Sequence, residues 1–241
     1  MAEFAFTSHV KVGEHRYRER YGLDFEDFVV GQVFKHRPGL TLSQQDNVEE
    51  SLDTLNQAML HFDAHSDTRK AYQGFTWSHA SILYNALENI PEIKKVVQVG
   101  IRDFSEEEWD YCQSQKDRVS IFLDQTLKER QYSGTPFSKL AEEIVSALPE
   151  KIWISFDIDG LDPRFCPHTG TPVPGGLDFS QAVYLMNQTV DSGRKIIGFD
   201  LVEVAPDPSG VSEWDANVGA RLLYKMTAAM LSSQGKIRRN L

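Results

Sequence analysis

The chain alternates between short runs that are almost entirely apolar and longer runs whose apolar residues recur every three or four positions. The short runs, at 58–62, 96–103, 119–124, 151–159 and 195–204, are typical of buried strands. The longer runs predict helices at 78–90, 105–115, 137–149, 180–193 and 216–231. Because strands and helices follow one another in turn, we expect an α/β fold with a mostly parallel sheet.

Polar residues and breakers mark the ends of several predicted helices. Ser105 is expected to cap the helix that begins SEEEW, whose acids suit the positive end of the helix dipole. Ser180 is expected to cap a later helix, which should end at Gly193, and Pro149 should stop the helix before it.

Acidic residues gather where the strand 151–159 ends, in the stretch SFDIDGLDPRFCPHTGTPVPGG. Asp157 and Asp159 are two residues apart, so on an extended strand both carboxylates point to the same side. The carboxyl ends of parallel strands are where such sheets bind ligands. Two carboxylates this close need a counter-charge, and a metal ion supplies one.

A second acidic stretch, HFDAHSD, follows the apolar run 58–62. Asp63, His65 and Asp67 alternate with other residues, so they share one side if the strand stays extended. Carboxylates with an imidazole form a mostly oxygen ligand set, which suits Mn²⁺ better than Zn²⁺. The two stretches together offer enough ligands for two metal ions.

The net charge and the lack of long apolar runs argue against several classes of protein. The chain has 241 residues and a formal net charge of −10, which argues against nucleic acid or an anionic membrane as a partner. No apolar run approaches the ~20 residues that span a bilayer, and the first residues lack the apolar core of a signal peptide. We therefore expect a cytoplasmic protein that acts on small molecules.

Five motifs occur in a fixed order from about Leu60 to the C-terminus: DAHSD, SFDIDGLDP, GTPVPGG, FDLVEVAP and EWDANVGARLLYKM. Together they resemble the ureohydrolase family, which includes arginase, agmatinase and formimidoylglutamase. The resemblance implies a three-layer αβα fold, hydrolysis of a guanidino group with release of urea, and two Mn²⁺ ions per chain. It also implies a homo-oligomer, a trimer or hexamer, and a small guanidino substrate.

The resemblance also assigns roles to individual residues. Asp63 and Asp157 would bridge the two metals, His65 and Asp159 would bind mainly one of them, and Asp67 the other. Glu203 would hold the substrate guanidinium, since a carboxylate matches that planar group. His79 would pass a proton to the leaving amine, and Asp103 would bind the amino end of the substrate.

The first 60 residues depart from the family pattern. The glycine-glycine-x-histidine-serine loop that carries the sixth metal ligand is absent, and VGEH at 12–15 is only a distant echo of it. Residues 15–65 instead resemble the N-terminus of a MaoC-like enoyl-CoA hydratase, in which His61 would be the catalytic imidazole and Asn56 stands where many members have Asp. The two resemblances meet at HFDAH. We therefore favour a junction between an N-terminal segment, 1–60, of different origin and a catalytic domain, 61–241. The alternative is that 1–60 is a divergent ureohydrolase N-terminus and that its likeness to the hydratase is chance.

This departure leaves three functions open. The first is a working ureohydrolase, agmatinase-like, which holds one Mn²⁺ instead of two and has impaired activity unless another group replaces the missing metal ligand. His61, His36 or water are candidates to fill the gap. The second is a MaoC-like hydratase, and the third is a catalytically inactive fusion chain.

Overall fold

The computed structural model describes residues 9–13, 16–19 and 58–237. The chain divides into two compact units, 1–43 and 44–241. In the first, β1 (His9–Gly13) pairs antiparallel with β2 (Arg16–Glu19). Most of the hydratase-like segment 15–65, including Asn56 and His36, lies outside the described residues, so its origin and the boundary at residue 60 stay predictions.

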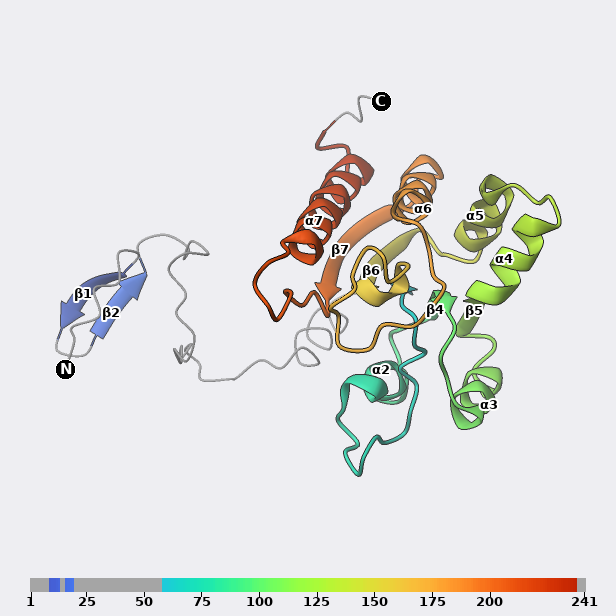
Figure 1. Ribbon diagram of the computed structural model, residues 1–241, viewed down its shortest axis with the longest axis horizontal. Coiled ribbons are helices and arrows are strands. Elements are labelled where there is room, and N and C mark those ends of the chain that lie inside the picture. Colours follow the sequence, from blue (N-terminus) through green and yellow to red (C-terminus); the bar gives the residue numbers. More distant parts are fainter. Residues whose placement is uncertain (1–8, 14–15, 20–57, 238–241) are drawn as a thin grey trace. The chain divides into compact units, whose positions relative to one another are not determined.

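The second unit is built on a sheet of five parallel strands (Figure 1). In spatial order these are β5 (Val119–Leu123), β4 (Lys95–Ile101), β3 (Ala58–Phe62), β6 (Lys151–Asp157) and β7 (Lys195–Val202). Every residue of the central strand β3 is buried. The parallel sheet confirms the α/β prediction, and the bounds agree with the apolar runs to within a few residues.

Helices cover both faces of this sheet and make it the middle of three layers (Figure 1). Ala58, Leu60 and Phe62 pack in one core with the helices α4 to α7, whereas Met59 packs in a second core with α2 and α3. Because successive strand residues point to opposite faces of the sheet, β3 contributes side chains to both cores. The helices are α2 (Ile82–Asn89), α3 (Glu106–Ser114), α4 (Asp124–Tyr132), α5 (Phe137–Ser146), α6 (Phe179–Asp191) and α7 (Trp214–Ser233).

The predicted helix ends are partly right. Ser105 caps α3 as expected, in a reciprocal pair with Glu108. Ser180 is not the cap of α6, which begins after Asp178; the Asp178 backbone N–H donates to Gln181 Oε1 at 3.0 Å. Gly193, with φ of 85°, ends that helix as predicted.

Two further elements differ from the sequence prediction. Helix α4 directly follows β5 and was not predicted, because Leu127 is its only buried apolar residue and no apolar stripe marks it. The helix expected at 78–90 begins as a 3-10 turn at His79–Ser81 and becomes α2 only from Ile82.

Within residues 58–237 and the short hairpin, none of the helices has the length and apolar character needed to cross a membrane.

Candidate metal and substrate site

The parallel pairing of β3 and β6 places the two acidic stretches side by side. Phe62 lies opposite Phe156 in the ladder, so the loops that follow Phe62 and Asp157 leave the sheet together. Gly160 lets them approach closely, because a Cβ there would lie only 2.7 Å from the Asp63 nitrogen. A cavity of about 380 Å³ opens at these strand ends, where ligands of parallel sheets bind.

The acids do not reach this cavity along extended strands, as the sequence analysis assumed. β3 ends at Phe62, and Asp67 has a positive φ of 54°. β6 ends at Asp157, and Ile158–Gly160 forms a 3-10 turn in which the Asp159 backbone N–H donates to Asp157 Oδ1 at 2.9 Å. Tight turns therefore bring these side chains together.

Asp63 is buried between two histidines. Its Oδ2 lies 2.9 Å from His61 Nε2, and its Oδ1 lies 3.4 Å from His65 Nδ1 and accepts the His65 backbone N–H at 2.6 Å. Burial opposes ionisation of Asp63, but His61 and His65 outweigh it and hold its pKa below the usual range. Asp63 is thus an ionised carboxylate inside the protein.

Asp159 faces the same histidine from the other strand. His65 Nδ1 lies 3.1 Å from Asp159 Oδ2, while Asp159 Oδ1 accepts the Ala64 backbone N–H at 3.0 Å. Thr171 Oγ1 donates to Asp159 Oδ2 at 3.2 Å. Burial disfavours a charged His65, but its hydrogen bonds to Asp159 and Asp63 outweigh this and raise its pKa to about 10.

Asp67 and Asp157 are short of a counter-charge. The carboxylate of Asp67 has no hydrogen-bond or ion-pair partner among residues 58–237, and burial followed by repulsion from Asp63 raises its pKa well above the usual range. Burial, followed by repulsion from Asp63 and Asp159, likewise raises the pKa of Asp157. A cation bound beside these carboxylates would supply the counter-charge that they lack.

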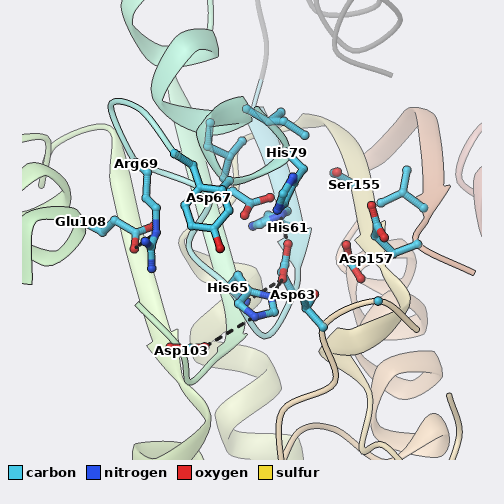
Figure 2. A pocket seen from close by; sticks show the side chains of 18 of the residues that line it. His61, Asp63, His65, Asp67, Arg69, His79, Asp103, Glu108, Ser155 and Asp157 are labelled. Carbon is cyan, nitrogen blue, oxygen red and sulfur yellow. Dashed lines mark hydrogen bonds and ion pairs between the residues drawn. The ribbon is translucent and has the colours of Figure 1, made fainter. Parts of the chain in front are cut away.

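Two groups of residues each offer ligand atoms that all lie within 4.8 Å of one another. One group is His61, Asp63 and Asp67, and the other is Asp63, His65 and Asp159. Their oxygen-rich chemistry and unpaired negative charge fit a divalent cation, with Asp63 common to both groups. Figure 2 shows Asp157 across the cavity from Asp63, and it belongs to neither group.

The three predicted substrate residues line the same cavity. Glu203 directly follows β7 with φ of 60°, and its carbonyl accepts from Thr169 Oγ1 at 2.9 Å. His79 is exposed and contacts the edge of Tyr72, with 5.5 Å between ring centroids. The Asp103 side chain is 60% exposed and lies 3.8 Å from His65 Nε2, which places it at the rim (Figure 2).

Arg102, the neighbour of Asp103 in the sequence, does not pair with it. Its guanidinium donates instead to the carbonyl oxygens of Asp159 and Val173, at 2.7 and 2.8 Å. Arg102 therefore ties the loop after β6 to β4.

Further cavity residues were missed by the sequence analysis. Asp200 of β7 accepts from Trp153 Nε1 at 2.6 Å and from Ser155 Oγ at 2.9 Å, and burial raises its pKa. Glu108 accepts the Thr68 backbone N–H and pairs with Arg69. The signal for Asp200 was a lone acid near the carboxyl end of an apolar strand; nothing in the pattern distinguished Glu108 from the other acids of its helix.

The fold and the cavity define a three-layer α/β protein whose candidate metal-binding residues lie at the carboxyl ends of its strands. The arginase family model matches residues 40–229, and the chain belongs to this family.

Two curated relatives and one solved structure show how similar the chain is. It is 36% identical to N(1)-aminopropylagmatine ureohydrolase of Thermus thermophilus over 168 residues, which cover 69% of this chain and 52% of that protein. It is 37% identical to the mitochondrial guanidino acid hydrolase of Homo sapiens over 175 residues, or 71% and 47% of the two chains. The structure of agmatine ureohydrolase of Thermoplasma volcanium superposes with a TM-score of 0.63 at 26% identity, covering 80% of this chain and 61% of the other.

The chain thus spans about half the length of the curated relatives it matches.

Proposed function

We propose that the protein is a metal-dependent hydrolase that cleaves a guanidino group and releases urea in an agmatinase-like reaction. The observation that carries this proposal is the convergence of Asp63, His65 and Asp67, with Asp159 beside His65, at a cavity that Glu203 and His79 also line. The matched relatives support it, because their names state hydrolysis of aminopropylagmatine, guanidino acids and agmatine.

The metal of this site would be Mn²⁺, held by Asp63, His65 and Asp159 at one position and by Asp63 and Asp67 at the other, with Asp157 available from across the cavity. Manganese, when bound, supplies a nucleophilic water at neutral pH, because metal ions lower the pKa of water. The second position is short of one histidine, because the sequence has no glycine-glycine-x-histidine-serine loop. We therefore propose weaker binding there and reduced activity.

The chain's own residues position the substrate. The Glu203 carboxylate accepts two N–H groups of the guanidinium and fixes the carbon that water attacks. As the bond from that carbon to the amine nitrogen breaks, His79 gives its proton to this nitrogen, and urea and the amine leave. Asp103, at the rim, binds a cationic tail of the substrate.

For the N-terminal segment, the proposal concerns only its evolutionary origin. We propose that 1–60 derives from a MaoC-like protein and that 61–241 is the catalytic domain, although the arginase match begins at residue 40. The hydratase function gains no support from the matched proteins. By family resemblance we also propose a trimer or hexamer in the cytoplasm.

The first experiment measures manganese per chain after incubation with Mn²⁺ and exhaustive desalting, followed by urea release from agmatine, aminopropylagmatine, arginine and guanidino acids. We expect one tightly held ion, a second only at higher Mn²⁺, and urea from one of these compounds.

The matched variants are Asp157→Asn, which should abolish urea release, and Asp162→Asn, a turn residue outside the cavity, which should not. Full urea release by Asp157→Asn would contradict the site assignment.

A further inference from the structure

Two buried polar residues face each other in the middle of the sheet. His61 of β3 lies directly opposite Gln98 of β4 in the parallel ladder. They are 4% and 0% exposed, so their polar atoms must be satisfied by protein. Among residues 58–237, Asp63 is the only ionisable group at hydrogen-bonding distance from the His61 ring. The hydrogen bonds of Gln98 therefore decide which His61 nitrogen carries a proton.

The orientation of the Gln98 amide follows from its neighbours. One side of the amide lies 2.7 Å from the carbonyl oxygen of Ser66, which only accepts, so this side is the NH₂ group, Nε2. Consistently, Ser66 Oγ donates to Gln98 Oε1 at 3.2 Å. The second N–H of Gln98 Nε2 points at His61 Nδ1, 3.4 Å away.

An N–H group facing His61 Nδ1 requires a lone pair there, since two donors would repel each other. The proton of the ring is then on Nε2, which lies 2.9 Å from Asp63 Oδ2 and donates to it. A histidine binds a metal through a nitrogen lone pair. With Gln98 in place, the Nε2 atom that faces the candidate metal site has none, although His61 lies close enough to Asp63 and Asp67 to be a ligand.

We propose that His61 is a positioning residue that holds Asp63 and is not a metal ligand, with its tautomer set by Gln98. The donated hydrogen bond fixes the carboxylate common to both groups of ligand atoms. It also means that His61 does not replace the missing loop histidine. The consequence for metal binding rests on the proposed function, whereas the tautomer does not.

The tautomer is measured on the full chain without metal. Protein labelled with ¹⁵N at histidine is studied by NMR through its imidazole nitrogens, and the His61 signals are assigned by their loss in His61→Gln. We expect a proton on Nε2 and a bare Nδ1. A bare Nε2 overturns the proposal, whether or not the protein binds metal or releases urea. Gln98→Met should lose the single tautomer, while Gln113→Met, an exposed matched control, should keep it.

The effect of His61 on metal binding is measured by Mn²⁺ titration and by X-ray absorption of the protein loaded with Zn²⁺. His61→Leu should weaken Mn²⁺ binding by about 10 to 100-fold, as loss of a residue that orients a ligand does. His61→Gln, which keeps a donor, should recover part of this loss. The number of imidazole ligands per zinc should stay the same in both variants. Loss of one imidazole ligand in His61→Leu would overturn the proposal.

Discussion

At Asp67, the requirement for binding metal and the requirement for a stable metal-free fold are most clearly opposed. Asn tolerates the positive φ of 54° and removes only the charge. Asp67→Asn should weaken Mn²⁺ binding at least 10-fold, because loss of a ligand costs no less than loss of a residue that orients one. The same variant should raise the thermal midpoint of the metal-free protein at pH 8, because it removes a carboxylate repelled by Asp63.

The rise in thermal midpoint caused by Asp67→Asn should depend on pH. Because the pKa of Asp67 is raised in the folded state, its folded form binds a proton more tightly than the unfolded form, whose pKa is about 3.9. The wild-type protein therefore loses stability as pH rises through the folded pKa. We expect the midpoints of variant and wild type to converge at acidic pH and to separate as pH rises, in melting curves recorded with a chelator. Asp117→Asn, at an exposed site, is the control, and a gain independent of pH would contradict the argument.

At the scale of single elements, α3 links helix capping to the cavity. Ser105 accepts the Glu108 backbone N–H at 3.3 Å, and the Glu108 carboxylate returns a bond to the Ser105 N–H at 2.9 Å. Ser105→Ala should cost about 1 kcal/mol, which is about 2–4 °C in the thermal midpoint of a domain of this size. Ser114→Ala, in the last turn of the same helix, should change it less, and equal losses would show that capping is not the cause.

The elements also show what the sequence could predict. The apolar runs predicted all five strands of the sheet, because parallel strands are buried on both faces and leave no polar alternation. Helix α4 was missed because it buries one apolar side chain, Leu127. The cap of α6 was placed two residues late, since Asp178 and Ser180 are both good caps in sequence terms and only the backbone chooses.

The sequence predicted which residues form the candidate site better than it predicted how they are arranged. The motifs named Asp63, Asp67 and Asp157 of the cavity but missed Asp200 and Glu108. Period-two spacing also gave the wrong reason for the convergence of the named acids, which depends on the turns after Phe62 and Asp157. The tautomer of His61 depends on Gln98, which is 37 residues away in the sequence. Such pairs across neighbouring strands follow from register, which composition and periodicity do not contain.

At the scale of the whole molecule, metal binding should couple to stability. The cavity brings together residues from β3, β6 and the loops after them, and this arrangement exists only in the folded chain. A ligand that binds only the folded state at 100 times its Kd stabilises it by about 2.7 kcal/mol. For a domain of this size that predicts a midpoint about 5–11 °C higher with Mn²⁺ than with chelator.

The variant Asp63→Asn separates this coupling from a general effect of salt. Asp63 belongs to both groups of ligand atoms, so its loss should remove the Mn²⁺-dependent shift at either position. The paired melting curves, with Mn²⁺ and with chelator, therefore compare two chains that differ by one charge at the centre of the site. If Asp63→Asn keeps the full shift, manganese stabilises the protein from elsewhere on its surface, and the cavity at the strand ends is not the metal site.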